Sequence, residues 1–122
     1  MATEKILVVD DSPTELQLMA ESLVDRGYQV ITATNGLDAL EAAIKEHPRL
    51  ILLDVLMPGK NGFQVCRQLK TDPATSDIKI IIVSSKCQES DRFWGLRQGA
   101  DEYLGKPVND ETLLQHISAL LG

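Results

Sequence analysis

Three aspartates, a serine and a lysine stand at positions in this sequence where parallel strands would end. Asp10 and Asp11 follow the first short apolar run, Asp54 follows the third, Ser84 the fourth, and Lys106 lies just beyond the fifth. Two like charges about 4 Å apart repel by roughly 4 kcal/mol at an effective dielectric constant of 20. Lys106 can neutralise one carboxylate, and the remaining repulsion must be offset by protonation or by a bound cation. Oxygen ligands of this kind suit Mg²⁺, which favours a phosphoryl oxygen as a further ligand.

These residue types divide naturally into roles in phosphoryl transfer. Asp54 stands alone after its run and is the best candidate for a nucleophile that forms an acyl phosphate. Asp10 and Asp11 would hold the cation, Ser84 would donate to a phosphoryl oxygen, and Lys106 would supply positive charge. Singly, Asp11 could simply cap a helix and Asp54 could simply end a strand, but the whole set together predicts a site.

Five short apolar, β-branched runs alternate with helical patterns along the chain. The runs are Ile6–Val9, Val30–Ala33, Leu50–Leu53, Ile78–Val83 and, more weakly, Tyr103–Leu104. Runs this short and continuous are typical of strands covered on both faces. The alternation predicts an α/β fold: a doubly wound, five-stranded parallel sheet in the flavodoxin-like order 2-1-3-4-5, with five helices. Ligands bind such sheets at the carboxyl ends of the strands, where the polar residues fall.

Helix starts can be read from the capping residues. Ser12 is a good N-cap, Pro13 fits the first helical position, and Glu15 would complete a capping box. Asn35 caps the second helix, whose apolar stripe is expected to comprise Leu37, Leu40, Ala43 and Ile44. The other helices are expected after Gly62, from Asp91 to Gln98, and after Asn109.

Composition limits the classes of protein that remain. The 122 residues suffice for one domain, and 12 Lys and Arg against 18 Asp and Glu give a net charge of −6. This balance argues against binding to nucleic acid or to an anionic membrane surface. No apolar stretch approaches the roughly 20 residues of a membrane span, and Met1–Lys5 does not begin a signal peptide. With Cys66 and Cys87 read as free thiols, we expect a soluble, cytoplasmic, single-domain protein.

Over essentially its whole length, the chain resembles the receiver domains of two-component response regulators, of the stand-alone CheY-like or PilH-like kind. The resemblance is carried by the pair Asp10-Asp11, the motif Asp54-x-x-Met57-Pro58-x-x-x-Gly62, Ser84, and the motif Tyr103-x-x-Lys106-Pro107. Each motif is weak alone, but together and in this order they are highly specific.

The resemblance implies a signalling module rather than an enzyme that acts on other substrates. Residues 1–122 would form a single receiver domain without an output domain, which catalyses only its own phosphorylation and dephosphorylation. A sensor histidine kinase or histidine phosphotransfer protein would be the donor, in motility or chemotaxis-like control. A target protein would bind the fourth helix, fifth strand and fifth helix, where Trp94 is either a partner anchor or half-buried packing. A monomer is expected, with dimerisation on phosphorylation as the alternative.

The resemblance also assigns roles to individual residues. Asp54 would be the phosphoacceptor, and Mg²⁺ would bind to Asp11, Asp54 and the backbone carbonyl of Leu56, with Asp10 acting through water. Phosphoryl binding and switching would fall to Ser84, Tyr103 and Lys106, and structural roles to Pro58, Gly62 and Pro107, with a cis Lys106–Pro107 bond.

Two other classes of protein fit the sequence less well. A phosphatase of the haloacid-dehalogenase type also forms an aspartyl phosphate, but it needs Asp-x-Asp on its first strand and a cap insertion. Here the first strand is followed by Asp10-Asp11-Ser12-Pro13. A flavodoxin needs a hydroxyl-rich phosphate loop there, and two aspartates would repel the phosphate.

Overall fold

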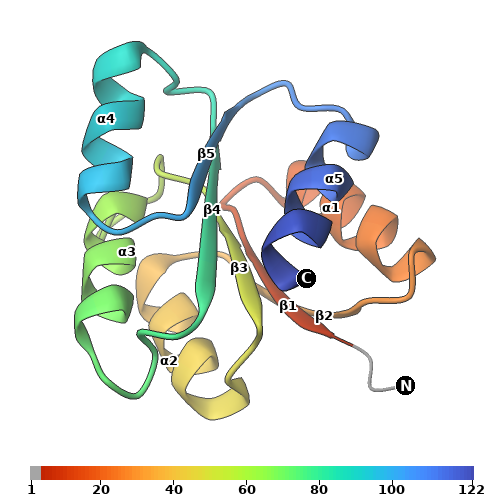
Figure 1. Ribbon diagram of the computed structural model, residues 1–122, viewed down its shortest axis with the longest axis horizontal. Helices are drawn as coiled ribbons and strands as arrows, with labels where there is room; N and C mark the ends of the chain where they lie inside the picture. The colour runs from red at the N-terminus through yellow and green to blue at the C-terminus, as the bar shows by residue number, and fades with distance from the viewer. Residues whose placement is uncertain (1–3) are drawn as a thin grey trace.

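In a computed structural model, which describes residues 4–122, five parallel strands form one sheet in the order β2-β1-β3-β4-β5 (Figure 1). The strands are β1 (Lys5–Val9), β2 (Gln29–Ala33), β3 (Leu50–Leu53), β4 (Lys79–Ser84) and β5 (Glu102–Gly105). Every residue of β3 is buried, because helices cover both faces of the sheet, and this explains its continuous apolar sequence. The predicted fold class and strand order are confirmed, while the first three residues of the Met1–Lys5 segment lie outside the described part.

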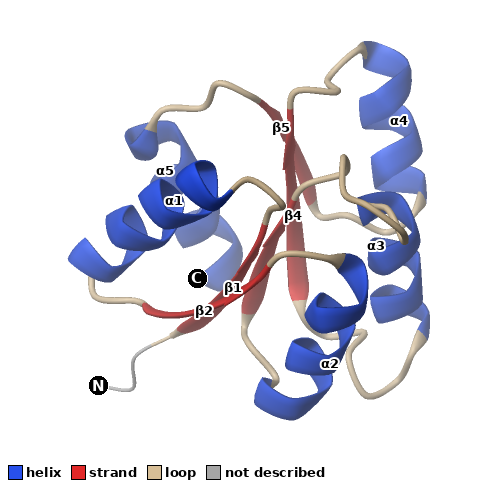
Figure 2. Cartoon of the chain, turned by 180° about the vertical axis from the view of Figure 1, so that it is seen from behind, coloured by secondary structure: helices blue, strands red, loops and turns tan. Residues whose placement is uncertain are grey.

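Five helices flank the sheet in two layers. They are α1 (Pro13–Asp25), α2 (Gly36–Glu46), α3 (Gly62–Thr71), α4 (Glu89–Arg97) and α5 (Asp110–Leu121). Helices α1 and α5 cover one face, and α2, α3 and α4 cover the other (Figures 1 and 2). Two buried apolar clusters result, one on each side of the sheet. The sheet is therefore a rigid central layer whose strand ends are fixed relative to one another.

Side-chain caps fix where four of the helices begin. Each of these caps accepts a hydrogen bond from the backbone N–H three residues further on, which the helix itself cannot satisfy. The capping residues are Ser12, Asn35, Asn61 and Asn109. Helix α4 begins at Glu89, two residues before the predicted start, because Asp91 accepts a hydrogen bond from the backbone N–H of Gln88 at 3.1 Å.

The buried face of α2 differs from the predicted stripe. Leu37 and Ile44 are 69% and 60% exposed, whereas the buried residues are Gly36, Ala39, Leu40 and Ala43. A Cβ at Gly36 would lie 2.6 Å from the carbonyl oxygen of Lys60. Helix α2 thus packs closely against its neighbours mainly through small residues, and the larger apolar side chains of Leu37 and Ile44 are exposed to solvent.

Within residues 4–122, no helix has both the length and the apolar composition needed to cross a bilayer. Cys66 is buried, Cys87 is partly buried, and both are free thiols. Helix α4 exposes three large apolar side chains, Phe93, Trp94 and Leu96, and Trp94 is 53% exposed.

Candidate functional site

The three predicted aspartates converge at the carboxyl edge of the sheet. Val9 is paired with Leu53 in the β1–β3 register, so the next residues, Asp10 and Asp54, leave adjacent strands side by side. Asp10, Asp11 and Asp54 each offer one oxygen within 4.8 Å of the others. Asp10 and Asp54 are 1% and 6% exposed, and Asp11 is exposed. The predicted convergence is confirmed.

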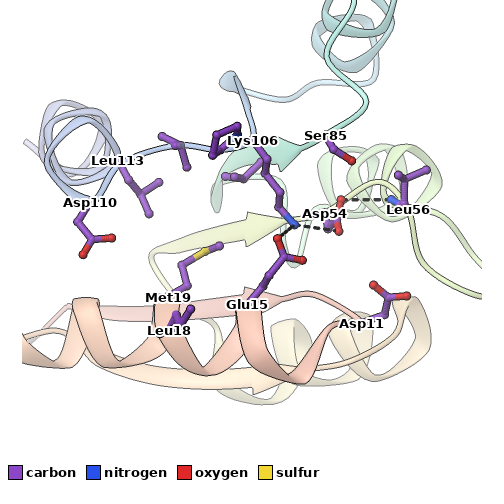
Figure 3. A pocket seen from close by; sticks show the side chains of 13 residues that line it. Asp11, Glu15, Leu18, Met19, Asp54, Leu56, Ser85, Lys106, Asp110 and Leu113 are labelled. Atoms are coloured by element: carbon purple, nitrogen blue, oxygen red, sulfur yellow. Dashed lines mark hydrogen bonds and ion pairs between the residues drawn. The ribbon is translucent and has the colours of Figure 1, made fainter.

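Lys106 lies beside two of the three aspartates of this cluster. Its ammonium group donates to Asp10 Oδ2 at 2.7 Å and to Asp54 Oδ2 at 3.3 Å. It also forms an ion pair with Glu15 Oε1 at 3.3 Å (Figure 3). Burial acts to lower the pKa of Lys106, but the hydrogen bond to Asp10 and the charges of Asp54, Asp10 and Glu15 outweigh burial and raise it. The lysine is therefore a charged bridge between the strand ends and α1.

Glu15 belongs to the site, although its sequence position predicts a capping box with Ser12. The expected box does not form, because the Ser12 N–H donates to Asp10 Oδ1 at 2.9 Å instead of to Glu15. Ser12 Oγ still accepts from the Glu15 N–H at 3.4 Å, and the Glu15 carboxylate is free to reach Lys106. The available signal was position: Glu15 lies in the first turn of α1, close behind the aspartates that follow β1.

The loop between β3 and α3 holds the Asp54 carboxylate. The Leu56 N–H donates to Asp54 Oδ1 at 3.3 Å, and the Leu56 side chain is half exposed. The first residue of α3 is Gly62, whose N–H donates to the Val55 carbonyl at 3.1 Å. A Cβ at Gly62 would lie 2.2 Å from the Asp54 carbonyl oxygen. The glycine is therefore needed because the helix begins directly against the strand end.

Two prolines flank the site. Pro58 is exposed in the loop that follows Leu56. Pro107 lines the cleft next to Lys106, and the Lys106–Pro107 peptide bond is cis. Pro58 therefore lies in the loop that follows Asp54, and Pro107 in the loop between β5 and α5 that contains Lys106.

Ser84 and Tyr103 are connected through the backbone of Lys86. Ser84 is fully buried, and its Oγ accepts a hydrogen bond from the Lys86 N–H at 3.1 Å. The Tyr103 hydroxyl donates to the Lys86 carbonyl oxygen, and the Tyr103 side chain is buried. Burial and the nearby Asp91 carboxylate raise the pKa of Tyr103 to about 12. The Tyr103 hydroxyl is consequently a hydrogen-bond donor, not an anion, at neutral pH.

A cleft of about 650 Å³ gives access to Asp54. One wall comes from α1, and the other from β4 and from the start of α5 with the segment before it (Figure 3). Among the lining residues four are acidic and one, Lys106, is basic. Ser85 lines the cleft rather than the buried Ser84.

The family model of the response regulator receiver domain matches residues 6–118. The chain therefore belongs to the response regulator receiver domains, the class that its fold and acidic site also define. It is 52% identical over 117 residues to PilH of Pseudomonas aeruginosa, covering 96% of this chain and 97% of PilH.

Solved structures agree with this assignment. The chain superposes on the chemotaxis protein CheY4 of Vibrio cholerae with a TM-score of 0.92 and 33% identity, covering 98% of this chain and 99% of CheY4. It superposes on the BeF₃-activated receiver domain of DrrB with a TM-score of 0.89 and 30% identity, covering 98% of each chain. The protein is thus a PilH homologue and a two-component signalling module rather than a catalytic enzyme, and the phosphatase alternative is not supported.

Proposed function

We propose that Asp54 accepts a phosphoryl group from a phosphohistidine on a sensor histidine kinase or a histidine phosphotransfer protein. A carboxylate oxygen of Asp54 attacks phosphorus, the N–P bond breaks, and its electron pair returns to the imidazole. The observation that supports this role is the grouping of Asp54 with two further carboxylates and with Lys106, whose ammonium lies 3.3 Å away. Asp54 also lines the cleft, so a phosphodonor can reach it.

The acidic cluster fits a bound Mg²⁺. Two ligands of one Mg²⁺ lie at most about 4 Å apart, so oxygens of Asp10, Asp11 and Asp54 within 4.8 Å of one another need only small rotations. The Leu56 carbonyl would be a further ligand, and Asp10 would act through water, as the resemblance implies. When bound, the ion would offset the carboxylate repulsion and polarise a phosphoryl oxygen. The chain would then promote its own phosphorylation and, with water as the nucleophile, its own dephosphorylation.

Ser84, Tyr103 and Lys106 would convert phosphorylation into a change of surface. Lys106 would pair with the phosphoryl oxygens, which bring roughly two negative charges. Ser84 would donate its hydroxyl hydrogen to one of these oxygens, and the Lys86 backbone, which contacts both Ser84 and Tyr103, would shift. The Tyr103 ring could then take another position. The outcome is a population shift, limited by the partner's preference for one of the two states.

The proposed output is contact with a target protein through the α4-β5-α5 face. Helix α4 offers exposed apolar side chains for such a contact, Phe93, Trp94 and Leu96. Similarity to PilH over 97% of its length and to the chemotaxis protein CheY4 supports a receiver domain that acts in motility or chemotaxis-like control. We expect a cytoplasmic monomer that changes partners, or dimerises, on phosphorylation; the two free cysteines fit a reducing compartment.

Phosphorylation by acetyl phosphate in the presence of Mg²⁺ tests the proposal. Intact-mass measurement should show one added phosphoryl group on the wild type and none on Asp54→Ala. The variant should keep its fold, measured by circular dichroism, because the substitution relieves repulsion within the cluster. Phosphorylation of Asp54→Ala at the wild-type rate would contradict the assignment.

A further inference from the structure

Lys106 has a third carboxylate neighbour, Glu15, which the family resemblance does not assign to the site. Its Oε1 lies 3.3 Å from Lys106 Nζ, the same distance as Asp54 Oδ2. The Glu15 side chain is 48% exposed, whereas those of Asp10 and Asp54 are 2% and 7% exposed. Glu15 is thus the one partner of Lys106 that can leave without stranding a buried charge.

An incoming phosphoryl group must form its own ion pair with the Lys106 ammonium. An ammonium has three donors, and three carboxylates already surround this one. Asp10, which is buried, makes the shortest contact, at 2.7 Å. Asp54 is the proposed acceptor itself. The contact most readily given up is therefore the ion pair with Glu15.

Glu15 also lies on the route to the acceptor. It belongs to the first turn of α1 and lines the same cleft as Asp54 (Figure 3). Figure 3 shows its carboxylate directed at the Lys106 ammonium from the α1 side, while Asp54 approaches from the strand end. A phosphoryl group on Asp54 would meet both the lysine and this extra negative charge.

We propose that Glu15 is a positioning residue that holds Lys106 in the resting state and competes with the phosphoryl group for it. The inference rests on the proposed function of Asp54. Glu15 lowers the affinity of the site for a phosphoryl group in two ways: its ion pair draws the Lys106 ammonium toward α1, and its negative charge repels the phosphoryl group. Its removal should therefore strengthen phosphoryl binding, although the residue lies within the site.

The test is binding of BeF₃⁻, a phosphoryl analogue that attaches to the acceptor carboxylate, measured by titration calorimetry in excess Mg²⁺. Glu15→Gln keeps the length of the side chain and removes its charge. A lost charge roughly 5–6 Å from the analogue should tighten the dissociation constant by about three- to tenfold at low salt. The gain should shrink as ionic strength rises.

Glu21→Gln is the matched control, because it removes the same charge from the exposed surface of α1, where Glu21 accepts a hydrogen bond from Gln17. Its BeF₃⁻ affinity should stay within twofold of the wild type, and Glu15→Asp, which keeps the charge, should bind more weakly than Glu15→Gln. Equal affinities of Glu15→Gln and Glu21→Gln, or weaker binding by Glu15→Gln, would overturn the inference alone. Absence of Mg²⁺-dependent BeF₃⁻ binding in the wild type would instead overturn the proposed function.

Discussion

At the scale of single residues, the site depends on one partly buried cation, Lys106, that is shared among three carboxylates. Lys106 contacts Asp10, Asp54 and Glu15, and their charges raise its pKa despite burial. The lysine therefore remains protonated throughout the physiological range. The positive charge of Lys106 allows the buried carboxylates of Asp10 and Asp54 to lie close together. Asp11 remains exposed at the carboxyl edge of the sheet.

The buried thiol of Cys66 leads to a prediction about how stability depends on pH. Burial raises the pKa of its thiol to about 12, and the sulfur donates to the Gln98 carbonyl at 3.6 Å. Above about pH 9 an unfolded chain loses this proton while the folded chain keeps it. The free energy of unfolding should then fall by up to about 1.4 kcal/mol per pH unit between pH 9 and 12.

Urea unfolding of the wild type and of Cys66→Ala at pH 8 and pH 10 measures this effect. The wild type should lose more stability than Cys66→Ala over this interval, because contributions from other groups, Tyr103 included, are common to both. The partly exposed Cys87 provides the control, and Cys87→Ala should behave like the wild type. Equal losses in the wild type and in Cys66→Ala would show that the thiol is not the cause.

At the scale of elements, α3 begins directly against the end of the strand that carries Asp54. Gly62→Ala would place a methyl group within 2.2 Å of the Asp54 carbonyl oxygen and 2.8 Å of the Val55 Cα. Backbone must move to relieve this overlap, so we expect a loss of about 1–3 kcal/mol of stability. Urea unfolding should detect the loss, and the rate of phosphorylation by acetyl phosphate should fall with it.

Gly95→Ala in α4 is the matched comparison. Its Cβ would meet ring atoms of Tyr103 at 2.6 and 2.7 Å, not the backbone at the acceptor. It should affect the Tyr103 environment while leaving Mg²⁺-dependent phosphorylation of Asp54 in place. A Gly62→Ala variant as stable and as reactive as the wild type would refute the role given to this glycine.

Much of this element-level structure was predictable from sequence. Continuous apolar runs revealed all five strands, and caps such as Asn35 and Asn109 revealed helix starts. Leu37 and Ile44 were wrongly assigned to the buried face of α2, because an apolar stripe alone does not show which side of a helix packs against the sheet. The close packing at Gly36 determines which side of α2 is buried. Glu15 was missed for a related reason: local pattern favours a capping box, and the competing contact with Lys106 lies 91 residues away in sequence.

At the scale of the whole molecule, the parallel sheet brings together residues that are distant in sequence. Asp10, Asp54 and Lys106 meet because β1, β3 and the segment after β5 all deliver their next residues to one edge. A chain of hydrogen bonds connects this edge to the α4-β5-α5 face. It runs from Ser84 through the Lys86 backbone to Tyr103 on β5. One edge thus carries the proposed chemistry, and an adjoining face carries the proposed contact with a partner.

The central claim is that these carboxylates form a Mg²⁺-dependent phosphoacceptor site. The most direct measurement is peptide mapping by mass spectrometry after treatment with acetyl phosphate, with Mg²⁺ present or removed by chelation. We expect one phosphoryl group, on the peptide that contains Asp54, and a rate at least about tenfold lower without Mg²⁺, as loss of a metal worth several kcal/mol implies. Modification of a different residue, or an equal rate without the metal, would contradict the account.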